Sequence, residues 1–134
     1  MTDEQRMVRD FHERFGALVS DRPTWCGDDV HRLRVALIEE ELAEFRNAGE
    51  AQSLVEIADA LADLLYVVYG AGVTYGIDLD PVFREIHRAN MSKGDPEVVR
   101  RPDGKILKGA NYVPPDVRAV VEAQARQAAA VATA

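Results

Sequence analysis

Apolar residues recur at every third or fourth position along three successive segments of the chain, and this spacing constrains the fold more than any other feature. It marks one face of a helix with 3.6 residues per turn. It predicts helices over residues 3–19, 29–48 and 52–75. A shorter helix is expected over 81–91, because Asp80 can cap it and proline is favoured at the first helical position. We therefore expect an all-α protein, a bundle of four to five helices.

The chain after residue 91 has a less regular pattern. Residues 97–107 resemble two short extended pieces around a Pro-Asp-Gly turn, which predicts a small C-terminal hairpin. The Ala-rich tail, residues 117–134, is expected to be helical or partly disordered. We expect residues 1–116 to form one domain, because the 47% hydrophobic content is sufficient for an ordinary core.

The charge balance and the single cysteine argue against several classes of protein. A net charge of −7 argues against a nucleic-acid-binding or anionic-membrane surface, because both require a basic footprint. No apolar run approaches the ~18 residues of a membrane span, and the polar N-terminus has no signal-peptide pattern. The one cysteine, Cys26, rules out an internal disulfide. We expect a soluble, cytoplasmic protein.

Two of the predicted helices carry acidic stripes that have no Lys or Arg three or four residues away. The stripes are Glu40, Glu41 and Glu44 in the second helix, and Glu56, Asp59 and Asp63 in the third. If these helices pair as an antiparallel hairpin, the stripes face each other and their like charges repel. A divalent cation that prefers oxygen ligands, Mg²⁺ or Mn²⁺, would relieve that repulsion. The alternative is a solvated acidic face, while a di-iron site is disfavoured because the chain lacks Glu-x-x-His pairs.

Basic residues gather farther along the chain. Seven of the 16 lie between positions 84 and 108: Arg84, Arg88, Lys93, Arg100, Arg101, Lys105 and Lys108. A basic segment near a carboxylate-bound cation suits a polyphosphate ligand. Plain surface charge is the alternative interpretation.

Taken together, these motifs resemble those of the all-α nucleoside triphosphate pyrophosphohydrolases. This superfamily includes MazG-like proteins, dimeric dUTPases and phosphoribosyl-ATP pyrophosphohydrolases. The motifs that carry the resemblance are Glu41-x-x-Glu44, Glu56-x-x-Asp59 and Asn90-x-x-Lys93. Longer blocks, such as LRVALIEEELAEF and EIADALADLLYVVYGAGVTYGID, extend the likeness over most of residues 8–116.

The resemblance implies a metal-dependent site and assigns residues to it. The implied cation ligands are Glu41, Glu44, Glu56 and Asp59, with Glu40 as a further ligand or as the base for water. The implied nucleotide contacts are Asn90 and Lys93, with Lys105 and Lys108 at phosphate. Asp63 is the alternative metal aspartate, but Ala60 stands where that alignment requires a glutamate, so the Asp59 register is the better match.

Three further side chains are candidates for contacts with a nucleotide. His12 lies between apolar neighbours and is either a structural histidine or a wall of the base pocket. Trp25 either stacks on a nucleobase or covers an edge of the core. Tyr112, in the stretch GANYVPP, is a candidate for closing over the site.

The implied reaction is the Mg²⁺-dependent hydrolysis of a nucleoside triphosphate to the monophosphate and pyrophosphate. A water oriented by Glu40 or Glu41 would attack the α-phosphate. By resemblance, the first expected substrate is dUTP or a related pyrimidine deoxynucleotide, with nucleotide-pool house-cleaning as the role. The alternatives are hydrolysis of phosphoribosyl-ATP in histidine biosynthesis, or a non-catalytic helical adaptor or nucleotide sensor. We expect a homodimer or homotetramer, because nearly every helix has an apolar face to cover.

Overall fold

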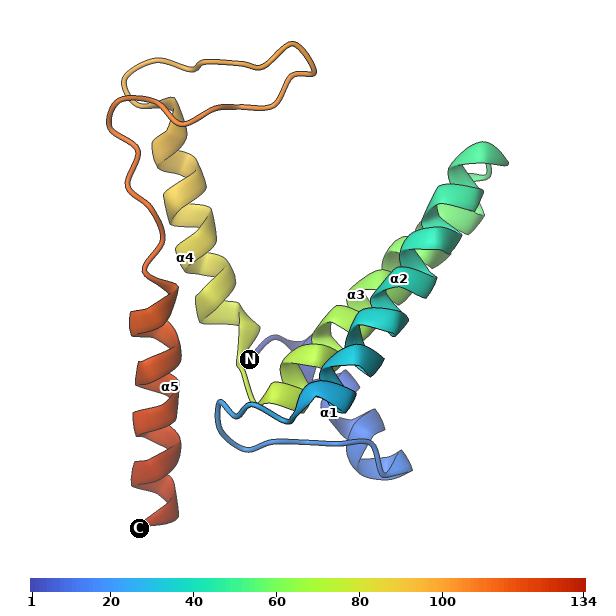
Figure 1. The fold of residues 1–134 in the computed structure, drawn as a ribbon, viewed down its shortest axis with the longest axis vertical. Helices are drawn as coiled ribbons and strands as arrows, with labels where there is room; N and C mark the ends of the chain where they lie inside the picture. The colour runs from blue at the N-terminus through green and yellow to red at the C-terminus, as the bar shows by residue number, and fades with distance from the viewer. The chain divides into compact units, whose positions relative to one another are not determined.

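A computed structural model describes residues 1–134 and contains five α-helices and no strand (Figure 1). The all-α prediction is confirmed. The chain divides into two compact units, Met1–Leu79 and Asp80–Ala134, which are described separately. The expected domain over residues 1–116 stays a prediction. None of the five helices combines the length and the apolar composition that crossing a membrane would require.

The first unit consists of three helices, α1 (Asp3–Phe15), α2 (Asp28–Glu50) and α3 (Leu54–Tyr75). α3 packs against both α1 and α2, and Figure 1 shows α2 and α3 running side by side. Only residues 51–53 join α2 to α3, so these helices form an antiparallel hairpin. This is the hairpin on which the predicted acidic site depends.

Two glycines set the ends of α1 and α3. α1 ends at Phe15 rather than near residue 19, because Gly16 adopts a left-handed conformation with a φ of 73°. Gly76 ends α3 in the same way, with a φ of 67°. A Cβ at Gly76 would lie 2.2 Å from the carbonyl oxygen of Arg22, so the loop before α2 can cross the end of α3 only if position 76 has no side chain.

A buried glutamine fastens α1 to the chain beyond α3. Gln5 is fully buried, its Nε2 donates to the carbonyl of Ile77 at 2.7 Å, and its Oε1 accepts from the N–H of Leu79 at 3.0 Å. Gly72 leaves room for this side chain, because a Cβ there would lie 3.0 Å from Nε2. The other buried side chains of this unit are Val8, His12, Ala48, Ala60, Val73 and Thr74.

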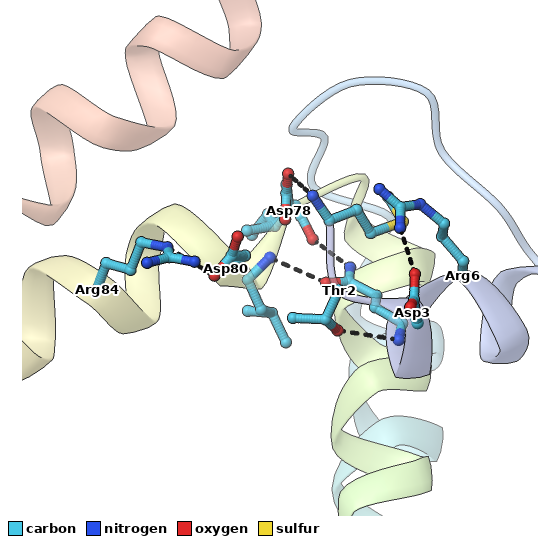
Figure 2. Close-up of polar contacts among 10 residues, drawn as sticks. Thr2, Asp3, Arg6, Asp78, Asp80 and Arg84 are labelled. Atoms are coloured by element: carbon cyan, nitrogen blue, oxygen red, sulfur yellow. Dashed lines mark hydrogen bonds and ion pairs between the residues drawn. The ribbon is translucent and has the colours of Figure 1, made fainter.

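Polar contacts also hold the start of the chain (Figure 2). The amino group of Met1 donates to the carboxylate of Asp78 at 2.7 Å. The hydroxyl of Thr2 caps α1 by accepting from the backbone N–H of Gln5 at 3.2 Å. These contacts position the first turn of α1.

The second unit carries α4 (Leu79–Met91), the short 3₁₀ turn η1 (Ser92–Gly94) and α5 (Val117–Ala132). α4 begins two residues earlier than expected. Asp80 therefore lies in its first turn, where it accepts a hydrogen bond from Arg84 at 2.9 Å (Figure 2).

The predicted hairpin is reduced to a single β-bridge between Arg100 and Ile106. Next to the bridge, the N–H of Leu107 donates to the carbonyl of Val99 at 2.8 Å. The structure therefore has a tight turn here without named strands. α5 follows and covers most of the Ala-rich tail.

Candidate metal centre

Three carboxylates from α2 and α3 converge across the hairpin. Glu41 and Glu44 lie one turn apart on α2, and Asp63 lies opposite them on α3. One oxygen from each lies within 4.8 Å of the others. Opposite oxygen ligands around Mg²⁺ are about 4.2 Å apart, so small side-chain movements would suffice to enclose one divalent cation.

Glu41 is the most confined of the three. It is half-buried, whereas Glu44 and Asp63 are exposed, and its Oε2 is buried without a hydrogen-bond partner. Burial raises the pKa of the Glu41 carboxyl above its usual value, and the negative charges of Glu44, Asp63, Glu40 and Asp59 raise it further. A cation would supply the partner that this oxygen lacks, and the donor set of three carboxylates fits a hard divalent ion.

Glu56 and Asp59 lie beside a shallow groove of about 400 Å³ next to this cluster. Both helices line it, with Glu44, Asn47, Ala48, Ala51, Glu56, Asp59 and Ala60. Glu44 belongs to both the cluster and the groove, so the two groups of acids are contiguous. The structure thus brings Asp63 to Glu41 and places Asp59 along the groove, and the choice of metal aspartate stays a prediction.

Glu40 is exposed on α2 and lies outside the three-carboxylate cluster. Its charge nevertheless reaches Glu41, whose pKa it helps to raise. The residue is therefore near the cluster and open to water. Its role as a ligand or base stays a prediction.

The two aromatic candidates of the first unit have contrasting surroundings. His12 is only 4% exposed, and its Nδ1 lies 2.9 Å from the carbonyl of Leu18. Because a carbonyl only accepts, Nδ1 carries the proton and Nε2 is an acceptor in the neutral ring. Trp25 is 63% exposed and stacks on Tyr75, with the ring planes 5° apart and the centroids separated by 6.0 Å. The Tyr75 hydroxyl in turn lies 2.7 Å from Nδ1 of His31.

The other predicted nucleotide contacts lie in the second unit. Asn90 is exposed on α4, and Lys93 is half-buried in η1. Lys105 and Lys108 are exposed in the loop that follows, and Nζ of Lys108 lies 5.0 Å from the ring centroid of the half-buried Tyr112. Their contact with a substrate stays a prediction.

Arg34 is absent from the sequence-based predictions, although its surroundings are unusual. It is half-buried on α2, and its Nε is buried without a hydrogen-bond partner. A signal was present in the sequence, because no carboxylate lies three or four positions away. Those positions hold Val30, His31, Leu37 and Ile38.

Comparison with models of protein families shows which family the chain belongs to. The model of the phosphoribosyl-ATP pyrophosphohydrolase family matches residues 8–90, which include the whole α2–α3 hairpin. The chain belongs to the phosphoribosyl-ATP pyrophosphohydrolase family. The predicted resemblance to the all-α pyrophosphohydrolases is confirmed. The enzymes of this family hydrolyse an acid-anhydride bond of a nucleotide.

A viral protein shares part of this sequence. An uncharacterized protein of Acanthamoeba polyphaga mimivirus is 51% identical to the chain over 49 residues. The match covers 37% of this chain and spans 20% of the length of the viral relative.

Proposed function

We propose that this chain is a divalent-cation-dependent pyrophosphohydrolase that cleaves a nucleoside triphosphate between its α- and β-phosphates. The products are a nucleoside monophosphate and pyrophosphate. The cluster of Glu41, Glu44 and Asp63 supports this most directly, because it holds a buried carboxylate oxygen without a partner in a pyrophosphohydrolase family member. Buried polar atoms are normally hydrogen-bonded. A solvated acidic face, as in an adaptor, would leave that oxygen in contact with water.

The acidic residues would have two different roles, as ligands of the cation and as the base for water. Bound Mg²⁺, or Mn²⁺, would neutralise charge on the phosphates and make the α-phosphorus more electrophilic. Glu41, Glu44 and Asp63 would hold the ion, with Glu56 and Asp59 as further ligands beside the groove. Glu40, exposed next to the cluster, would orient the attacking water and accept its proton. The new bond joins the water oxygen to the α-phosphorus, and pyrophosphate departs with the electrons of the broken bond.

The remaining candidates would bind the nucleotide. Their proposed roles are nucleotide contact for Asn90 and Lys93, phosphate contact for Lys105 and Lys108, and base contact for His12, Trp25 and Tyr112. The exposed ring of Trp25 favours stacking. His12 is only 4% exposed and its Nε2 lies against the backbone of α3 at Gly70, so its proposed contact with the base rests on the resemblance alone.

Two substrates are proposed for the same site. Resemblance to the dimeric dUTPases favours dUTP or a related pyrimidine deoxynucleotide. The description of the matching family favours phosphoribosyl-ATP. Both carry a triphosphate, so the chemistry at the carboxylates would be the same and the contacts beyond the triphosphate would decide between them.

We also propose that the chain works as a homodimer or homotetramer. Large apolar side chains of α1 and α3 are exposed in the single chain: Met7 59%, Phe11 45%, Phe15 66%, Leu61 43% and Leu65 57%. Apolar patches of this kind mark surfaces that associate. Sedimentation velocity should give at least twice the mass of one chain, and a monomer at micromolar concentration would contradict this proposal.

The test of the activity is a panel of nucleoside triphosphates, dUTP and phosphoribosyl-ATP with Mg²⁺, with products identified by phosphorus NMR. We expect pyrophosphate and the monophosphate from at least one of them. Glu41→Gln should lower the rate by about 100-fold or more. Glu39→Gln, an exposed neighbour outside the cluster, is the matched control and should retain the rate. A Glu41→Gln protein as fast as the parent would refute the role of Glu41, and a panel that releases no pyrophosphate would refute the activity.

A further inference from the structure

Arg34 and the carboxylate cluster lie along one seam between α2 and α3. Arg34 precedes Glu41 by seven residues, which places both on nearly the same face of α2, about 10 Å apart along its axis. The same register holds on α3. Asp63 lies opposite Glu41, and Gly70, seven residues farther on, lies opposite Arg34.

The missing side chain of Gly70 makes room for two polar groups. A Cβ at this position would lie 3.0 Å from Nη1 of Arg34 and 3.2 Å from Nε2 of His12. The guanidinium on α2 and the imidazole on α1 therefore both approach the backbone of α3 at Gly70. This end of the seam therefore holds a guanidinium and an imidazole ring.

No carboxylate of the chain neutralises Arg34. Its Nε is buried and makes no hydrogen bond, although guanidinium nitrogens are donors only. Burial lowers the pKa of the Arg34 guanidinium, and the nearby Tyr75 offsets this in part. Arg34 is half-buried, and withdrawing the Nε donor of a charged group from both water and a partner is costly, so an anion beside this guanidinium would be favourable.

We propose that Arg34 is a phosphate-binding residue at the far end of this seam from the carboxylates. The planar guanidinium can donate two parallel hydrogen bonds to two oxygens of one phosphate, which suits it to this ligand better than an ammonium group. The identity of the ligand rests on the proposed function. The phosphate belongs either to the polyphosphate of a nucleoside triphosphate or to the additional phosphate of a phosphoribosyl group. A carboxylate of a second copy is the competing occupant, but the position of Arg34 on the seam of the cluster favours the substrate.

Binding can be tested without cation or turnover. The full chain, stripped of metal with a chelator, is titrated with inorganic phosphate and with ribose 5-phosphate in a calorimeter. The fluorescence of Trp25, the one tryptophan of the chain, serves as a second readout because Trp25 stacks on Tyr75 beside Arg34. Arg34→Gln should weaken phosphate binding about tenfold or more. Arg34→Lys keeps the positive charge but loses the two parallel hydrogen-bond donors of the guanidinium. Its affinity for phosphate should lie between those of the parent and Arg34→Gln.

Arg32→Gln is the matched control. Arg32 is exposed on the same helix and pairs with Asp29, so its loss removes one positive charge away from the seam. Phosphate binding should stay as in the parent. Thermal unfolding of each variant identifies any that fails to fold. If Arg34→Gln does not fold, phosphate binding is compared between the parent and Arg34→Lys instead.

The source of the phosphate follows from kinetics on the two proposed substrates. If Arg34→Gln raises the KM about tenfold for both dUTP and phosphoribosyl-ATP, Arg34 binds the polyphosphate that both substrates carry. A KM raised only for phosphoribosyl-ATP assigns it to the phosphoribosyl phosphate. The proposal is overturned if Arg34→Gln binds inorganic phosphate as well as the parent, or if its only defect is a lower oligomeric mass. Because the titration requires no hydrolysis, its outcome is independent of whether the chain is a pyrophosphohydrolase.

Discussion

Neutralising Glu41 should stabilise the cation-free protein, although Glu41 is proposed to be essential for activity. The Glu41 carboxylate lies within 4.8 Å of those of Glu44 and Asp63. Two unit charges at this distance repel by about 0.9 kcal/mol at the dielectric constant of water. The two pairs together give about 2 kcal/mol, which salt screening at an exposed cluster reduces to about 1 kcal/mol. Glu41→Gln keeps the shape of the side chain and removes both repulsions.

The effect has a defined pH dependence. The pKa of Glu41 is raised in the folded protein, so the folded state binds this proton more tightly than the unfolded state. The free energy of unfolding therefore falls as the pH rises from the ordinary value of 4.5 through the raised pKa. The advantage of Glu41→Gln should be present at neutral pH and disappear below 4.5, where the parent is protonated as well.

Thermal unfolding with a chelator at neutral pH measures this directly. The expected gain is about 3–5 °C in Tm for a chain of this size. Glu39→Gln, which removes the same charge from an exposed position on α2, should change Tm little. Saturating Mg²⁺ should raise the Tm of the parent and of Glu39→Gln but have little effect on Glu41→Gln. Equal Tm values for the two variants in chelator, or an undiminished Mg²⁺ effect in Glu41→Gln, would refute the reasoning.

Three further predictions concern the scaffold. Gly76→Ala should cost about 2–4 kcal/mol in urea unfolding, because it combines a left-handed φ with a backbone clash, whereas Gly49→Ala inside α2 should be neutral or slightly stabilising. Gln5→Ala should cost about 2–4 kcal/mol, because two backbone groups lose their partner; Gln5→Glu should also destabilise the fold at neutral pH, because it would bury a charge and set a carboxylate oxygen against the carbonyl of Ile77. The pKa of Glu85, measured by NMR, should be about 2, because the carboxylate accepts hydrogen bonds from Arg88. The contribution of this ion pair to the free energy of unfolding should therefore be present above pH 4.5 and be lost as the pH falls toward 2. A pKa of Glu85 near 4.5 would contradict the observed ion pair.

Apolar spacing was sufficient to predict helices α2 and α3, because it continues along each helix without an early breaker, although Leu42, Leu61 and Leu65 are exposed in the single chain. It failed at the end of α1, where the spacing continues through Leu18 and Val19. Gly16 ends the helix by its backbone conformation, which the positions of apolar residues do not report. The start of α4 differs for a similar reason, since cap preference alone does not decide between Leu79 and Pro81.

The cluster of carboxylates between α2 and α3 could be predicted, because unpaired carboxylates on two neighbouring helices need either water or a cation. Which aspartate meets Glu41 could not be predicted, because Asp59 and Asp63 lie about one turn apart and differ only in axial register. Side-chain packing along the whole hairpin sets that register. Arg34 posed the opposite problem. The sequence shows that Arg34 has no acidic partner on its own helix. Only the fold shows that Gly70 lies opposite Arg34.

The claim that Glu41, Glu44 and Asp63 hold a divalent cation is tested most directly by calorimetric titration of Mn²⁺ into the metal-stripped chain. The parent and Glu39→Gln should bind Mn²⁺ alike. Asp63→Asn should weaken binding about tenfold or more, because it removes a charged ligand from the cluster. An Asp63→Asn protein that binds Mn²⁺ as tightly as the parent would contradict the account.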